Sequence, residues 1–210
     1  MTPTISPFGD RAVEIAWPAT GYSAEANARA LALAAHLRSL DRFTEVTPGY
    51  ASTLAEFDPT RLDLGDAKAL VERELPNAPT SAPQGRTVDI PVRYDGPDLA
   101  TISKSSGLSE AEVISLHSAE PYRVCMVGFI PGFAFLSEVP AVLAHPRHAS
   151  PRAHVPAGSV GIAGWQTGIY GLDSPGGWQI IGQTSHALFD PDRTDPFLLH
   201  PGDSVRFIPE

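Results

Sequence analysis

Glycine, proline and hydrogen-bonding side chains are concentrated between residues 128 and 184 of the chain. Glycine at this density indicates positive φ angles or close backbone approach, and a packed core would not select the interleaved serine, glutamine, tyrosine and arginine side chains. Between Pro121 and Leu172 the only acid is Glu138, although the whole chain carries a net charge of -9. This stretch therefore predicts a ligand pocket, and the local lack of acids favours an anionic group such as phosphate or carboxylate.

Arg147 and Arg152 are the first candidates for binding that anion, because a guanidinium group can hold two oxygens through parallel hydrogen bonds. Backbone amides of the glycine-rich turns could assist, although glycine corners in a β-barrel would explain the same glycines. Ser159 either donates its hydroxyl to the ligand or turns the chain. The full set of candidate substrate- or phosphate-binding residues is Arg147, Arg152, Ser159, Gln166, Tyr170, Ser174, Gly176 and Gly177.

His117 is the candidate general base, and Glu120 lies three residues further on, a spacing that suits a helical pair or a loop contact. Both are therefore candidate catalytic residues. The alternative is a structural histidine at the end of a helix.

A metal site is not expected in this region. Its three histidines have no carboxylate between them, and two arginines lie among them that would repel a cation. These histidines are His145, His148 and His154.

Familiar patterns for acyl transfer and nucleotide binding are absent from the sequence. Ala157 stands where the nucleophile elbow of a serine hydrolase needs its first glycine, and residues 160–164 are typical of a strand where an elbow needs a helix. Neither Lys68 nor Lys104, the two lysines, follows a glycine, which excludes a P-loop. The glycine spacing of residues 158–164 is not a dinucleotide fingerprint.

Three phenylalanines and a cysteine are open to a structural interpretation. Phe129, Phe133 and Phe135 surround Pro131-Gly132 and are either core residues or an apolar lid over a pocket. Cys125 is the only cysteine, in a strand pattern, and without a Cys-x-x-Cys spacing or a nearby base we assign it to the core.

The first part of the chain predicts an α+β domain over residues 1–80. Strand patterns at residues 12–17 and 43–57 alternate with two helix patterns, the first at residues 23–40 and the second ending near Leu75. This order favours helices that cover one face of an antiparallel sheet.

The rest of the chain predicts a mostly-β barrel over residues 81–210. Residues 76–86 form the expected linker, because they are rich in proline and small residues and lack apolar periodicity. Short β-branched or aromatic runs separated by glycine and proline are typical of a closed or nearly closed barrel. The clearest expected strands cover residues 87–94, at a sheet edge because of Pro91, and residues 122–127, 160–162, 178–181 and 205–208, with a short helix that begins at the capping box Ser109-x-x-Glu112.

Composition excludes two classes of partner and suggests a compartment. A pI near 5.2 without a basic stripe argues against nucleic acid. No run of about 18 apolar residues could span a membrane. Because the first residues lack a signal-peptide pattern, we expect a cytoplasmic protein.

At the residues described above, the chain resembles the family variously called 5-oxoprolinase B subunit, allophanate hydrolase subunit 1 and KipI-like kinase inhibitor, which consists of carboxyltransferase subdomains C and D. The chain departs from the usual residues of that family at two places. Gly171 stands where proline is usual, and Ala134-Phe135 stands where Pro-Tyr is usual. We expect these departures to affect the rim of the pocket only. The shared motifs cover nearly the full length and are Phe8-Gly-Asp10, Leu116-His-Ser118, Gly128 to Phe133, Pro146 to Arg152, Val155 to Gly164, Gln166 to Tyr170, Ser174 to Gly182 and Pro201-Gly-Asp203.

The resemblance implies a ferredoxin-like N-terminal domain and a cyclophilin-like C-terminal barrel. It also implies membership of an ATP-dependent 5-oxoprolinase complex, which phosphorylates 5-oxo-L-proline and opens it to L-glutamate. The implied partners are a carboxyltransferase-like C subunit together with an A subunit. Such a chain would be inactive alone. ATP, with or without Mg, would be the co-substrate, and no tightly bound cofactor is implied.

Two other functions occur among proteins that resemble this chain. One is a KipI-like inhibitor of a sensor histidine kinase, and the other is a hydrolase subunit of allophanate or urea carboxylation metabolism. Fold alone does not decide between them. An arginine-bearing pocket with few acids suits the activation of a lactam by phosphorylation, so 5-oxoproline is the preferred substrate.

Overall fold

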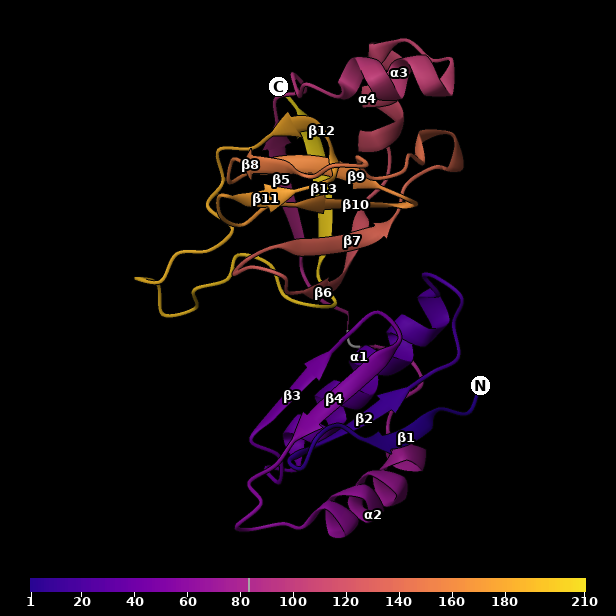
Figure 1. The fold of residues 1–210 in the computed structure, drawn as a ribbon, viewed down its shortest axis with the longest axis vertical. Helices are drawn as coiled ribbons and strands as arrows, with labels where there is room; N and C mark the ends of the chain where they lie inside the picture. Colours follow the sequence, from indigo (N-terminus) through magenta and orange to yellow (C-terminus); the bar gives the residue numbers. More distant parts are fainter. Residues whose placement is uncertain (83) are drawn as a thin grey trace. The chain divides into compact units, whose positions relative to one another are not determined.

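The computed structural model describes residues 1–82 and 84–210, which divide into two compact units, Met1–Gln84 and Gly85–Glu210 (Figure 1). The division falls within residues 76–86, the stretch expected to be a linker. Pro83, which belongs to that expected linker, lies outside the described residues.

The first unit is an α+β layer structure. Within residues 1–82, four antiparallel strands pair in the order β1-β2-β4-β3. Ser23 caps the first helix by accepting a hydrogen bond from the N–H of Ala26, and Asp63 caps the second through the N–H of Asp66. The elements are β1 (Thr4–Pro7), β2 (Ala12–Ala16), α1 (Ala24–Ser39), β3 (Glu45–Pro48), β4 (Ser52–Glu56), α2 (Leu64–Glu74) and the 3-10 helix η1 (Leu75–Asn77).

One face of this sheet is covered by the two helices, as the sequence predicts. Val13 and Ile15 alternate with more exposed residues along β2 and are fully buried, and Leu33 and Leu37 of α1 pack into the same cluster. Val71 brings α2 into it. The predicted helical spacing and strand alternation therefore meet in one core.

The second unit is mostly β. Within residues 85–210, a seven-stranded sheet runs in the order β12-β9-β10-β7-β6-β13-β5, and β8 and β11 form a two-stranded sheet. An antiparallel bridge between Arg93 and Gln183 connects its two ends, so the sheet is nearly closed into a barrel. The elements are β5 (Thr87–Val92), α3 (Leu99–Ser106), α4 (Glu110–Ser118), β6 (Tyr122–Val127), β7 (Ala134–Glu138), η2 (Ala141–Leu143), β8 (Arg152–Val155), β9 (Ser159–Ala163), β10 (Gln166–Ile169), β11 (Ser174–Gly176), β12 (Gln179–Gln183) and β13 (Ser204–Pro209).

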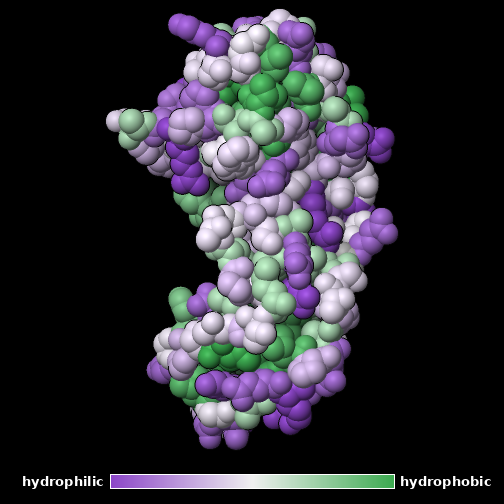
Figure 2. All heavy atoms as spheres, turned by 90° about the vertical axis from the view of Figure 1, so that its right-hand side faces the viewer, coloured by the Kyte–Doolittle hydropathy of each residue, from purple (hydrophilic) through white to green (hydrophobic). Residues whose placement is uncertain are grey.

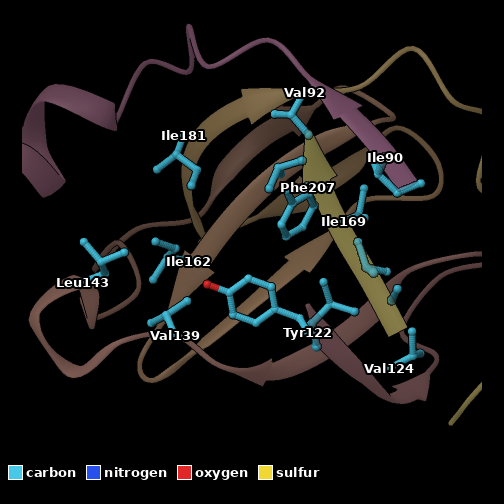
Figure 3. Close-up of a cluster of buried hydrophobic side chains, with 14 of the residues drawn as sticks. Ile90, Val92, Tyr122, Val124, Val139, Leu143, Ile162, Ile169, Ile181 and Phe207 are labelled. Atoms are coloured by element: carbon cyan, nitrogen blue, oxygen red, sulfur yellow. The ribbon is translucent and has the colours of Figure 1, made fainter. Parts of the chain in front are cut away.

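The interior of the barrel is filled by aliphatic and aromatic side chains from strands that are distant in sequence. Figure 3 shows Tyr122 and Phe207 among Ile162, Ile169 and Ile181, all pointing inward. Cys125 is also fully buried, in agreement with its predicted core role. Such a core holds the outer strands and loops in fixed positions.

Most expected strands of the second unit are confirmed, and one helix is an addition. β5 lies at the end of the sheet order, in agreement with Pro91, which has no N–H to donate. The capping box at Ser109 and Glu112 is present. The sequence did not predict α3, because its Ser- and Thr-rich turns have weak helix propensity and only Leu99 and Ile102 anchor it in the core.

Hydrophobic residues come to the surface in one area of each unit in Figure 2, while hydrophilic residues cover most of the remaining face.

Among the described residues, no helix has the length and apolar character needed to cross a membrane.

Candidate functional site

A pocket of about 300 Å³ lies on the outer side of the barrel, and we call it the aromatic pocket. Four of the predicted site residues line it, from three separate segments of the chain. Its lining consists of Phe129, Phe133, Phe135, Arg147, Pro151, Tyr170, Pro175, Gly176, Gly177 and Trp178.

The floor of the aromatic pocket is a cluster of rings centred on Phe133. Its ring centroid lies 4.5 Å from that of Phe135, 4.8 Å from Tyr170, 5.4 Å from Trp178 and 5.6 Å from Phe129. Ring pairs at these separations, three of them close to perpendicular, are favourable beyond the area that they bury. The pocket therefore offers flat apolar surfaces in a fixed arrangement.

The three phenylalanines divide between the two roles that the sequence left open. Phe133 is only 1% exposed and belongs to the core beneath the pocket, and Phe135 is partly buried. Phe129 is 66% exposed and has a φ of 69°, a conformation that is unusual for a residue with a Cβ. Strain of this kind at an exposed aromatic residue is typical of functional sites.

Two neighbouring glycines in the pocket differ in how much space a side chain would have at their positions. A Cβ on Gly176 would collide with the hydroxyl of Tyr170, so no larger residue fits there without moving that ring. A Cβ on Gly177 would approach nothing closer than 3.7 Å. Gly176 is therefore required for the close approach of β11 to Tyr170.

Arg147 is the cation of the aromatic pocket. Its guanidinium carbon lies 5.8 Å from the centroid of the Trp178 ring, a cation–π distance. Within residues 1–82 and 84–210, it forms no ion pair with an acid. This exposed guanidinium is therefore available to an anionic ligand.

The hydroxyl of Tyr170 stays protonated in this setting. Burial raises its pKa, and a backbone hydrogen bond from Trp178 and the nearby charges of Arg147 and Arg152 only partly oppose that shift. Tyr170 thus lies in the pocket as a neutral hydroxyl group.

Arg152 is placed differently from Arg147. Its Nη2 donates to Oδ1 of Asp98 at 2.6 Å, and its Nη1 donates to the carbonyl of Trp178 at 3.2 Å. The expectation that acids are lacking around both arginines is therefore wrong for Arg152, because the fold brings Asp98 there from a distant part of the chain. Its charge is neutralised within the protein.

The remaining candidate binding residues lie outside the aromatic pocket. Ser159 is buried at the start of β9 and, with Arg152, lines a second and more polar groove of about 500 Å³. The Nε2 of Gln166 donates to the carbonyl of Leu136, and the hydroxyl of Ser174 donates to the carbonyl of Pro175. No strand-to-helix elbow surrounds Ser159, in agreement with the sequence.

His117 lies inside the barrel, fully buried, and is not exposed to either pocket. The hydroxyl of Tyr94 lies 2.8 Å from its Nδ1, and Oγ1 of Thr167 lies 2.8 Å from its Nε2. Because the Thr167 hydroxyl donates to the carbonyl of Gly161, it accepts from Nε2–H, and Nδ1 accepts from Tyr94. Desolvation lowers the pKa of His117 to about 3, so the ring is neutral.

The predicted catalytic pair is not brought together as the sequence suggested. Glu120 is exposed beyond the end of α4, whereas His117 has Tyr94 and Thr167 as partners and stacks on Phe207 at 4.7 Å. A buried imidazole with both nitrogens occupied has no means of taking a proton from a ligand. The geometry favours the structural alternative for His117.

The three histidines of the site region make separate contacts. His148 Nε2 lies 3.3 Å from Asp98, His154 lies 3.9 Å from Asp173, and His145 contacts the carbonyl of Pro146. Among the described residues, no three or more histidine, cysteine or acidic side chains gather in a way that could hold a metal ion.

Two residues that shape the site are absent from the predicted set. Trp178 has a sequence signal, since it follows the glycine pair in a motif already identified. Asp98 has none, because it lies 54 residues before Arg152 and becomes its neighbour only through folding.

The chain matches the family described as carboxyltransferase domain, subdomain C and D, over residues 3–199. It is 47% identical over 182 residues to the 5-oxoprolinase B subunit of Escherichia coli O157:H7, a match that covers 85% of this chain and 83% of that protein. It is 40% identical over 209 residues to the 5-oxoprolinase B subunit of Haemophilus influenzae, a match that covers 98% of this chain and 97% of that protein.

Two solved structures have a fold similar to that of this chain. The crystal structure of TTHA0988 matches with a TM-score of 0.85 and 44% identity over 95% of this chain, which spans 40% of that longer chain. The urea amidolyase of K. lactis matches with a TM-score of 0.80 over 99% of this chain and 15% of that chain. At 18% identity, the latter likeness concerns the fold alone.

Proposed function

Because the chain belongs to the carboxyltransferase domain, subdomain C and D family, and relatives that it matches over most of their length are 5-oxoprolinase B subunits, we propose that it is the B subunit of an ATP-dependent 5-oxoprolinase complex. The complex opens 5-oxo-L-proline to L-glutamate together with the A and C subunits. This chain alone is inactive. The observation that carries the proposal is that sequence identity of 40% and 47% extends over most of the length of both this chain and those relatives.

The aromatic pocket is the part of this chain that meets the substrate. 5-Oxo-L-proline is a small lactam ring with one carboxylate, and a pocket of about 300 Å³ is at the small end of ligand sites. The rings of Phe133 and Trp178 offer flat faces to the lactam ring, and Arg147 offers its carboxylate a bidentate partner. Arg152 is not available for this contact, because Asp98 already occupies it.

The chemistry to be supplied is activation of an unreactive amide. Transfer of the γ-phosphoryl group of ATP to the lactam oxygen releases ADP and makes the ring carbon electrophilic. Water adds to that carbon, the C–N bond breaks with the nitrogen leaving as the amine, and a second water hydrolyses the resulting acyl phosphate to L-glutamate and phosphate. This chain has no glycine-rich lysine loop for the nucleotide. Its contribution is therefore to bind and orient the lactam, while the complex as a whole brings ATP to it.

Topology supports a finer description of both units. The order β1-β2-β4-β3, with α1 and α2 in the connections after β2 and β4, supports a ferredoxin-like sheet in which β1 takes the place of one outer strand. The nearly closed sheet of the second unit fits a cyclophilin-like barrel. We include both in the proposal.

Reconstitution tests the proposed function. ATP hydrolysis that depends on 5-oxo-L-proline is measured for the purified chain, for the chain with its C partner, and for the chain with both the A and C partners. We expect no turnover from the chain alone and turnover with L-glutamate as product from the complete set. Turnover by the pure chain would contradict the proposal that the chain is inactive without its partners. Turnover by the complete set with urea or allophanate, but not with 5-oxo-L-proline, would contradict the proposed substrate.

A further inference from the structure

Asp98 is the N-cap residue of α3, but its carboxylate does not cap that helix. An aspartate at this position ordinarily accepts a hydrogen bond from an amide of the first turn. Here Oδ1 instead accepts from Nη2 of Arg152 at 2.6 Å, and Oδ2 accepts from the N–H of Ile180 at 2.6 Å. With the residue only 4% exposed, these contacts join α3 to β8 and β12 through a buried charge.

The partners of Asp98 adjoin the residues of the aromatic pocket. His148, next to Arg147 in the chain, has its Nε2 3.3 Å from the same Oδ1, within ion-pair distance but without hydrogen-bond geometry. The N–H of His148 donates to the carbonyl of Gly177 at 2.8 Å, and Arg152 donates to the carbonyl of Trp178. Asp98 therefore holds together the two segments that carry Arg147 and Trp178, although it does not line the pocket itself.

We propose that Asp98 is a positioning residue that holds the guanidinium of Arg147 over the ring of Trp178 and so sets the affinity of the aromatic pocket for the carboxylate of its ligand. Removal of its charge leaves Arg152 without its charge-assisted acceptor and His148 without the carboxylate beside it, so the segment between them is held less firmly. The proposed effect of Asp98 on the position of Arg147 is argued from these contacts and does not depend on which ligand binds. The identity of the ligand as 5-oxo-L-proline rests on the proposed function.

The kinetic test uses the reconstituted complex and the variant Asp98→Asn, with Asp89→Asn as the matched control because Asp89 forms an exposed pair with Arg206. Asp98→Asn should raise KM for 5-oxo-L-proline about tenfold with little change in kcat, since one charge-assisted contact of the ligand is misplaced. Asp89→Asn should leave both constants unchanged. An equal KM for Asp98→Asn and the parent would overturn the proposal.

A double-mutant cycle separates positioning from general destabilisation. In an Arg147→Ala background, Asp98→Asn should have no further effect on KM, because the group through which Asp98 acts is gone. Effects that multiply would show that Asp98 acts independently of Arg147 and would overturn the proposal.

A readout without substrate keeps this inference separate from the proposed function. In ¹H–¹⁵N spectra of the full chain, the indole N–H resonance of Trp178, assigned with Trp178→Phe, should shift in the same direction in Asp98→Asn and Arg147→Ala and stay in place in Asp89→Asn. An unmoved resonance in Asp98→Asn would refute the positioning role. A complex that does not turn over 5-oxo-L-proline would refute the proposed function and leave this spectroscopic result valid.

A milder variant covers the case in which Asp98→Asn does not fold, as judged by circular dichroism. His148→Gln keeps the pair between Asp98 and Arg152 but removes the imidazole next to Arg147. It should shift the Trp178 resonance in the same direction by a smaller amount. No shift in this variant would likewise count against the proposal.

Discussion

The carboxylate of Asp98 accepts a hydrogen bond of 2.6 Å from Nη2 of Arg152, and this pair gives the two arginines of the site different roles. Arg152 is neutralised inside the fold, and Asp98 is nearly inaccessible to solvent. Arg147, five residues earlier, is exposed beside Trp178 and has no acid partner among the described residues. Substitution of Arg147 should therefore affect ligand binding directly, whereas substitution of Arg152 should first of all affect the stability of the second unit.

Replacement of Arg147 by lysine should impair the reaction without affecting the fold. Lysine keeps the charge but loses the planar fork that holds a carboxylate through two parallel hydrogen bonds. We expect kcat/KM for 5-oxo-L-proline in the reconstituted complex to fall by about 30-fold to about 1000-fold, or roughly 2 to 4 kcal/mol. Arg206→Lys, at an exposed pair on β13, is the control. A parental rate for Arg147→Lys would remove this residue from the site.

Replacement of Arg152 by alanine should instead destabilise the second unit. The change leaves the buried carboxylate of Asp98 without its strongest partner, and removal of one member of a buried pair costs about 3 kcal/mol. Denaturant unfolding measures the loss. Arg206→Ala breaks an exposed pair and should cost less than about 1 kcal/mol. Equal losses for the two variants would show that burial of Asp98 has no energetic consequence.

The two adjacent glycines of the pocket should respond differently to alanine. Gly176→Ala places a methyl group against the hydroxyl of Tyr170 and forces its ring away from Phe133, which should destabilise the unit by about 1 to 3 kcal/mol. Gly177→Ala meets only ordinary van der Waals neighbours and should change stability by less than about 1 kcal/mol. Urea unfolding of both variants tests this prediction. A larger loss of stability for Gly177→Ala than for Gly176→Ala would contradict it.

His117 should make the protein sensitive to mild acid. Its pKa is about 3 in the folded protein and about 6.5 when unfolded, so the unfolded chain takes up a proton that the folded chain refuses. The stability due to neutral His117 is fully present above pH 6.5 and is lost progressively as pH falls towards 3. From about pH 6.5 to about pH 5 the loss should be about 2 kcal/mol.

The acid sensitivity is tested by urea unfolding at several pH values. His117→Gln should be less stable than the parent at neutral pH, since the network from Tyr94 to Thr167 is disrupted, but its stability should depend less on pH under mildly acidic conditions. His186→Gln, at an exposed histidine, should retain the parental pH dependence. Identical pH profiles for His117→Gln and the parent would contradict the assignment.

Local patterns in the sequence were sufficient to predict most of the elements and the stretch of chain that lines the aromatic pocket. The alternation of Val13 and Ile15, the capping serines Ser23 and Ser109, and the edge strand with Pro91 depend on neighbours within a few residues, and all are confirmed. The stretch rich in glycine and arginine likewise supplied Arg147, Tyr170, Gly176 and Gly177 to one pocket.

The role of each polar group was decided only by tertiary structure. His117 has the same sequence neighbours whether it faces solvent or the barrel interior, and its neutrality comes from burial and from Tyr94 and Thr167, which are distant in the chain. Arg147 and Arg152 look alike in the sequence, and Asp98, brought to Arg152 by α3, separates them. Desolvation and ion pairing depend on which atoms meet in space, and sequence spacing alone does not contain that information.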